Sequence, residues 1–100
     1  MLHPIVQNVV CTCNIGCTLF LPGLARILEV GEYNPKRFAA VTFRLRYPKS
    51  TALYFGSGKI VCTGTKSKHA ARLAMMKYIH LIRTRLGLQV GMYGLMFKIW

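Results

Sequence analysis

Hydrophobic and polar residues alternate in three short runs between residues 38 and 64, and turn-forming residues separate the runs. Successive side chains of a strand point to opposite faces, so each run can be divided into two sides. Pro48 ends the first run, 38–46, and a Gly-Ser-Gly turn at 56–58 separates the second, 51–55, from the third, 59–64. One side is apolar and predicts the buried face of an antiparallel sheet, made of Ala39, Val41, Phe43, Leu45, Ile60 and Cys62.

The other side of these runs mixes aromatic with basic residues. It carries Phe38, Ala40, Thr42, Arg44, Arg46, Phe55, Lys59, Val61 and Thr63. An exposed face with this mixture is typical of a surface that meets nucleic acid. The start of one antiparallel strand lies near the end of the next, so we expect Phe38 and Phe55 at the same end of the sheet. Ordinary core packing of both rings is the alternative, and their phase opposite the apolar side argues against it.

Residues 5–14 alternate well enough to form another strand, with Val9, Cys11 and Cys13 on one side and Asn8, Val10 and Thr12 on the other. The four cysteines, at positions 11, 13, 17 and 62, show no C-x-x-C spacing, and no histidine is placed to complete a ligand set. We therefore favour buried, reduced thiols in a cytosolic or nuclear protein over a metal site.

Two helices are expected. Pro22 begins a short one that runs to about Glu29 and is ended by Gly31. Ser67 is a good N-cap for a long helix that ends near Leu86, before Gly87. The long helix has an apolar stripe at helical spacing: Ala71, Ala74, Met75, Tyr78, Ile79, Ile82 and Leu86. This order of elements predicts an α+β fold, in which one antiparallel sheet carries both helices on one face and leaves the other face open.

The net charge of +12 is the first indication of function, and it arises because only Glu29 and Glu32 oppose 14 Lys and Arg residues. A field of this strength favours an anionic partner, nucleic acid ahead of a membrane surface, although a basic protein that is merely soluble remains an alternative. No membrane span or secretory signal is expected, since Pro22-Gly23 interrupts the apolar stretch 15–28. Nothing resembles a nucleophile–base–acid set, so neither an enzyme nor a cofactor is expected.

Several long segments carry a family resemblance. They are VQNVV at 6–10, EYNPKRFAAV at 32–41, TAL at 51–53 with Phe55, SGK at 57–59 and VCTG at 61–64. Over roughly residues 4–87 the chain resembles the first of the two direct repeats of the TATA-box-binding protein core domain. The resemblance implies a half-saddle: a curved antiparallel sheet with two helices packed on its convex face. We take residues 1–100 as one such repeat, with 88–100 as a divergent closing strand or linker.

The resemblance also implies roles for residues of the open face. Phe38 and Phe55 would wedge into a base step and kink the duplex, and Asn8 and Thr63 would donate hydrogen bonds to minor-groove acceptors. The sugar and base-edge contacts would come from Val10, Leu53 and Val61, and the phosphate contacts from Arg37, Arg44, Lys59 and Lys66. The implied activity is transcription initiation in the nucleus on A·T-rich (TATA) double-stranded DNA. Other general transcription factors would bind the convex helices.

The chain stops at Trp100, about where a second repeat would begin, so only half a saddle is expected. Two other interpretations stay open. The first is a truncated protein-interaction module that engages transcription factors without stable DNA binding, and the second is a nonspecific basic RNA- or DNA-binding domain. We also expect strand 5–14 to lie at an unpaired, valine-rich edge, where a second copy could pair with it as a homodimer.

Overall fold

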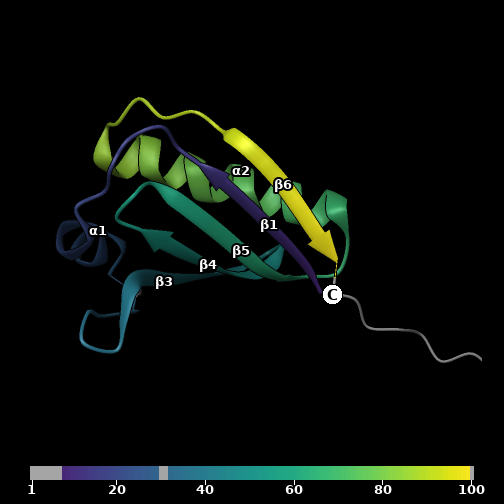
Figure 1. Ribbon diagram of the computed structural model, residues 1–100, viewed down its shortest axis with the longest axis horizontal. Coiled ribbons are helices and arrows are strands. Elements are labelled where there is room, and N and C mark those ends of the chain that lie inside the picture. The colour runs from purple at the N-terminus through teal and green to yellow at the C-terminus, as the bar shows by residue number, and fades with distance from the viewer. Residues whose placement is uncertain (1–7, 30–31, 100) are drawn as a thin grey trace, which may run out of the picture.

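Two helices cover one face of a six-stranded antiparallel sheet in the computed structural model, which describes residues 8–29 and 32–99 (Figure 1). The strand order is β2-β3-β4-β5-β1-β6. The strands are β1 Val9–Asn14, β2 Glu32–Asn34, β3 Phe38–Arg46, β4 Lys49–Phe55, β5 Lys59–Thr65 and β6 Tyr93–Ile99. The helices are α1 Leu21–Leu28 and α2 Lys68–Leu86. The expected α+β architecture, with both helices on one side, is confirmed.

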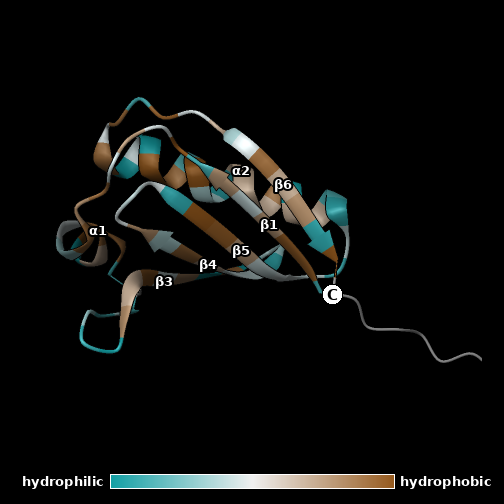
Figure 2. Cartoon of the chain, viewed as in Figure 1, coloured by the Kyte–Doolittle hydropathy of each residue, from teal (hydrophilic) through white to brown (hydrophobic). Residues whose placement is uncertain are grey.

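The core lies between the helices and the inner face of the sheet. In Figure 2 hydrophobic and hydrophilic bands alternate along α2, as in a helix with one apolar side. All of its expected stripe is buried except Leu86, which is half-buried. Polar atoms in this core have partners: the hydroxyls of Ser50 and Tyr78 lie 2.8 Å apart, and the Tyr54 hydroxyl donates to the Tyr78 carbonyl at 3.0 Å. These bonds satisfy the groups whose burial would otherwise be costly.

The helix ends follow from local chemistry. Ser67 Oγ accepts a hydrogen bond from the Ala70 N–H at 3.0 Å, and Gly87 adopts a left-handed conformation at φ 65°, so both expected caps of α2 are confirmed. Helix α1 begins one residue before Pro22, and its N-cap position is held by Phe20, which makes no side-chain capping bond. It ends at Leu28, with Glu29 at φ 58°, while Gly31 lies outside the described residues.

Strand boundaries differ in part from the expectation. The first strand begins at Val9, after Asn8, and residues 5–7 lie outside the described residues. Strand β4 begins at Lys49 because the turn before it is tighter than expected, and β5 extends to Thr65. At the start of β3 the expected burial is reversed: Ala39 is exposed and Ala40 is buried. Ala40 lies opposite Phe55, outside the main core cluster, in a depression that it shares with Phe38.

Strand β6 overturns the expected free edge at 5–14. After α2 the chain turns back, and residues 93–99 pair antiparallel with β1, with Cys11 opposite Phe97 and Thr12 opposite Met96. Strand β1 is therefore an interior strand with β5 on its other side, and the homodimer expected through this edge loses its structural basis. The short strand β2, which pairs with β3, was not expected from the sequence. Within the described residues the sheet edges are β2 and β6.

Candidate nucleic-acid interface

The register of the sheet brings side chains from five strands into a row across the open face. Thr42 of β3 lies opposite Leu53 of β4, and Leu53 lies opposite Val61 of β5. Val61 lies opposite Thr12 of β1, which lies opposite Met96 of β6. The first four are half-buried and Met96 is 67% exposed. This row across the middle of the open face is thus an uncharged floor of apolar side chains and hydroxyls.

Phe38 and Phe55 meet at one end of this face. Their ring centroids lie 5.8 Å apart in an edge-to-face arrangement with an interplanar angle of 76°. Phe38 is 49% exposed and Phe55 is half-buried, and neither belongs to the core cluster. The expectation that the two rings lie at the same end of the sheet and outside the core is confirmed. Edge-to-face contact is a favoured geometry, so the rings support each other while one side stays accessible.

Asn8 and Thr63 lie beside an irregularity in the pairing of β1 with β5. The register shifts between Val9 and Cys11, and Gly64 takes up the extra residue at φ 91°, a conformation that favours glycine. The Asn8 Oδ1 accepts a hydrogen bond from the Gly64 N–H at 2.9 Å. This bond orients the Asn8 side chain and leaves its amide donors for another partner. Thr63 is half-buried, opposite Thr51 of β4.

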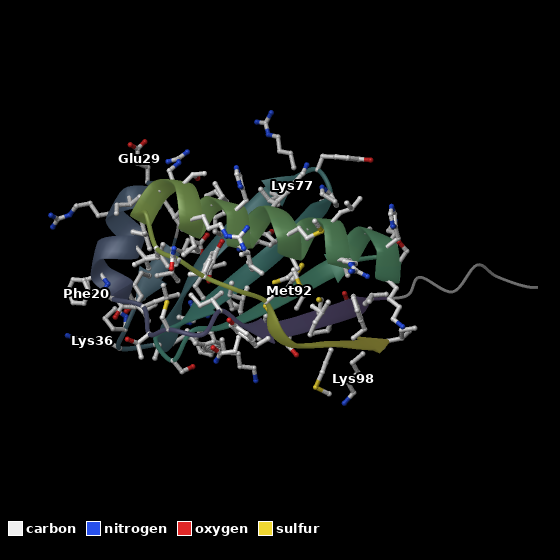
Figure 3. The ribbon with its side chains drawn as sticks, turned by 90° about the horizontal axis from the view of Figure 1, so that it is seen from above. Phe20, Glu29, Lys36, Lys77, Met92 and Lys98 are labelled. Carbon is white, nitrogen blue, oxygen red and sulfur yellow. The ribbon has the colours of Figure 1, made fainter. Side chains whose placement is uncertain are left out.

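The remaining expected apolar contacts, Val10, Leu53 and Val61, are half-buried on the open side of β1, β4 and β5. Val10 lies opposite Lys98 of β6, a basic residue that the sequence reasoning did not select. Figure 3 shows Lys98 projecting away from α2, whereas Lys77 projects on the helix side. In β6 the alternate residues Leu95 and Phe97 pack against the core, so Lys98, which follows Phe97, lies on the open face. This alternation is the sequence pattern from which Lys98 could have been predicted.

The residues expected to contact phosphates lie outside the apolar floor. Arg37, Lys59 and Lys66 are exposed, and Lys59 lies opposite Asn14 at one end of β5. Arg44 differs from these three, because its Nη1 donates to the Glu32 Oε1 at 2.7 Å across β2 and β3. The open face therefore holds a cationic border, one ion pair and an aromatic pair around a neutral centre.

The thiols of Cys11, Cys13 and Cys62 lie on the inner side of the sheet, and Cys17 lies in the segment between β1 and α1. Cys11, Cys13 and Cys62 are buried, Cys17 is half-buried, and all four are free. Burial, with smaller contributions from neighbouring Cys62 and Cys13, raises the pKa of Cys11 to about 12, and burial raises the pKa of Cys13 to about 11. These two thiols stay protonated near neutral pH. Among residues 8–29 and 32–99, no group of three or more His, Cys, Asp or Glu side chains is placed to hold a metal ion.

Neither helix in the described part of the chain is long and apolar enough to cross a membrane.

The open face offers aromatic contact, an apolar floor, hydrogen-bond donors and a cationic border. That combination suits a groove lined by acceptors and bordered by phosphates.

Comparison with known proteins identifies a family and relatives of the chain. Residues 3–84 match the family described as "Transcription factor TFIID (or TATA-binding protein, TBP)". The chain is 56% identical over 80 residues to the TATA-box-binding protein of Acanthamoeba castellanii, and the match covers 80% of this chain and 31% of that protein. It is 50% identical over 96 residues to the TATA box-binding protein-like 2 of Mus musculus, a match that covers 96% of this chain and 27% of that protein.

The fold is similar to a solved structure of Methanococcus jannaschii TBP. The TM-score is 0.76 at 40% sequence identity, over 92% of this chain and 51% of that one. The chain spans less than a third of the length of the two curated relatives described above.

Proposed function

The chain belongs to the TATA-box-binding protein family, and from this membership we propose that it binds the minor groove of A·T-rich promoter DNA and acts in transcription initiation. The observation that carries the proposal is the pair formed by Phe38, which is 49% exposed, and the half-buried Phe55, 5.8 Å apart, at the end of an open sheet face with a basic border. Folding alone gives no reason to leave such a pair on a cationic face, whereas a nucleic-acid interface uses both features.

In this proposal the two rings kink the duplex. Apolar side chains that enter a base step from the minor groove unstack it at a cost of a few kcal/mol, and the bent duplex then contacts more protein surface. TATA-box-binding proteins are themselves the established example of such bending, so the mechanism is carried over from the family to this chain. Phe38 presents its exposed side to the duplex, and Phe55 supports it edge-to-face.

The centre of the open face would determine which DNA sequence is bound most tightly. A·T pairs show only acceptors in the minor groove, which the amide donors of Asn8 and the hydroxyl of Thr63 can satisfy. A G·C pair adds the guanine amino group, which would lie against the apolar floor of Val10, Leu53 and Val61 without an acceptor. The preference for A·T-rich DNA follows from that unfavourable contact as well as from the donors.

The cationic border would hold the phosphates. Arg37, Lys59 and Lys66 are exposed and can reach them directly, which fixes the position of the duplex without reading its sequence. The helices on the other face would stay uncovered by DNA and available to other general transcription factors. Such a protein would work in the nucleus.

The test replaces both rings, Phe38→Ala with Phe55→Ala, and measures binding and bending of a TATA duplex whose ends carry a fluorescence donor and acceptor. We expect bending to disappear and affinity to fall by about tenfold or more, which corresponds to about 1.4 kcal/mol. The matched control is Phe20→Ala. Phe20 is also an exposed phenylalanine, at 77%, but it lies at the start of α1 and outside the proposed DNA-binding face (Figure 3).

A double variant that stays folded and still bends the duplex would contradict the wedging role. If the double variant unfolds, the rings are core residues and the proposal also fails. If the unaltered chain forms no complex with any duplex, the protein-interaction interpretation becomes the better account.

A further inference from the structure

We infer that Glu32 sets the strength of DNA binding by holding Arg44 in an ion pair that a phosphate must displace. The inference rests on the proposed function and deepens it, since it assigns an opposing role to a residue of the same face. Glu32 would weaken binding to every duplex by a similar factor and would not change the preference between sequences.

The ion pair belongs to the open face. Glu32 lies opposite Thr42 in the pairing of β2 with β3, and directly opposed residues of a sheet share a face. Arg44 is two residues beyond Thr42 on β3, so its side chain emerges on the same face. The Arg44 Nη1 and the Glu32 Oε1 lie 2.7 Å apart, and their side chains are 57% and 67% exposed.

Glu32 is unusual for its place. The chain has two acidic residues against 14 Lys and Arg, and one of them stands on the face that would meet a polyanion. Glu32 also lines, with Phe38 and Arg37, a depression of about 460 Å³ beside the aromatic pair. The other acidic residue, Glu29, lies at the end of α1, and Figure 3 places it on the helix side, away from Lys98.

Structural stability does not account for the pair. An ion pair with both side chains more than half exposed contributes little to folding, because water and salt screen it. The folding benefit is therefore small, while the cost to binding a polyanion is direct. Arg44 must leave Glu32 to reach a phosphate, and Glu32 then repels the same phosphates.

The pair also changes the dependence on salt. A cation that neutralises a phosphate releases the counterions condensed there, and each such contact steepens the decline of log K with log salt by about 0.9. Arg44 is already neutralised by Glu32, so it adds less than a full contact. Glu32→Gln keeps the size of the side chain, removes its charge and frees Arg44 to act as a full contact.

The experiment compares four variants with the unaltered chain: Glu32→Gln, Glu29→Gln, Arg44→Gln and the double variant E32Q/R44Q. Binding is measured over a series of salt concentrations with an A·T-rich duplex, a mixed-sequence duplex and inorganic polyphosphate. For Glu32→Gln we expect a dissociation constant about two- to fivefold lower at low salt on both duplexes, as the loss of an exposed pair implies. The salt slope should steepen by up to about 0.9, the value for one full phosphate contact.

The controls isolate the pair from net charge. Glu29→Gln removes the same charge from the helix side and should change neither affinity nor slope appreciably. In the Arg44→Gln background, Glu32→Gln should lose most of its effect, because no cation remains to be released. Thermal melts of all variants give the fraction folded, to which the binding curves are normalised.

Three outcomes would overturn the inference. Equal gains for Glu29→Gln and Glu32→Gln would mean that net charge alone acts. A full gain from Glu32→Gln in the Arg44→Gln background would mean that Glu32 repels phosphate without holding Arg44. If Glu32→Gln changed neither the affinity nor the salt slope for any ligand, the ion pair would have no role in binding.

Polyphosphate separates this inference from the proposed function. It offers phosphates without a minor groove, so a Glu32→Gln gain there supports the inference even if the chain shows no preference for A·T-rich duplex. A clear A·T preference without any Glu32→Gln gain would leave the proposed function standing and refute the inference.

Discussion

At the scale of single residues, Phe20 departs from the local rule for its position. It occupies the N-cap of α1, where Ser, Thr, Asp and Asn are preferred because their side-chain oxygen accepts from the first free N–H groups. Phe20 makes no such bond, and its ring lies over Gly23, where an added Cβ would come within 3.0 Å of it. The start of α1 therefore depends on Pro22 and on the burial of Leu21 and Leu24.

Replacing Phe20 with Asp should stabilise the protein by about 0.5–2 kcal/mol, because a carboxylate caps the helix and also favours its N-terminal dipole. Urea denaturation at neutral pH measures the difference. Phe20→Ala is the control, since it removes the ring without adding an acceptor. If Asp is no more stable than Ala at this position, the capping argument is wrong.

On the open face, residues that read the DNA sequence and residues that bind phosphate should respond differently to substitution. Thr63→Val keeps the shape and removes the hydroxyl, so we expect a smaller ratio of affinities between A·T-rich and mixed duplexes. Lys59→Gln should weaken both duplexes by similar factors and flatten the salt dependence. Competition binding with the two duplexes measures both effects. Equal losses on every duplex for both variants would favour nonspecific electrostatic binding.

At the scale of elements, the pairing of β1 with β5 places thiols together in the core. Cys11 lies opposite Cys62, and both are fully buried. Burial, together with the charge of nearby thiols, raises the pKa of Cys11 to about 12. Burial raises the pKa of Cys62 to about 11, although a hydrogen bond with Ser50 opposes the rise. The paired strands therefore hold protons that the unfolded chain releases at lower pH.

This difference predicts that stability falls as pH rises above about 9. Unfolded thiols titrate near 9.0, whereas Cys11 and Cys62 titrate near 12 and 11 when folded, so in between the folded state binds more protons. The contribution of these thiols to stability is then fully present below pH 9 and is lost as pH rises through about 11 for Cys62 and about 12 for Cys11. Urea denaturation between about pH 8 and about pH 10.5 measures the decline. Cys62→Ala should make the decline shallower, and an unchanged decline would contradict the assignment to these thiols.

At the scale of the whole molecule, charge is distributed over both faces, but only the open face should contribute to binding DNA. The open face would engage phosphates through Arg37, Lys59 and Lys66. The helix face is also basic, and Arg72 of α2 is exposed there. The positive field draws a duplex toward the protein from any side, and the contacts decide which face it meets.

Three phosphate contacts predict a slope of about −2.7 for log K against log salt, so affinity should fall by about 40-fold between 50 and 200 mM salt. Fluorescence anisotropy over a salt series measures the slope. Arg72→Gln on α2 should leave it unchanged, whereas Lys66→Gln should reduce it by about 0.9. If both variants changed the slope equally, the duplex would be binding to the helix face as well as to the open face.

The sequence alone was enough for the elements whose pattern is local. Alternation at 41–46 and 59–64 predicts which residues point inward, and the spacing of α2 with Ser67 and Gly87 predicts its length and both ends, because these depend on neighbours within a few residues. The same phase arguments place Phe38 and Phe55 together, as the ring distance confirms. Their contacts with DNA, and those of Asn8 and Thr63, stay predictions.

Only the tertiary structure decided features that join distant segments. Residues 93–99 carry only a weak strand pattern, and their pairing with β1, which removes the expected free edge, depends on how α2 returns the chain to that side of the sheet. The exchange of burial between Ala39 and Ala40 depends on the neighbouring strand, where Phe55 lies opposite Ala40. The contact between Glu32 and Arg44 needs strand β2, whose three residues are held by β3 and carry too little pattern to be recognised in the sequence.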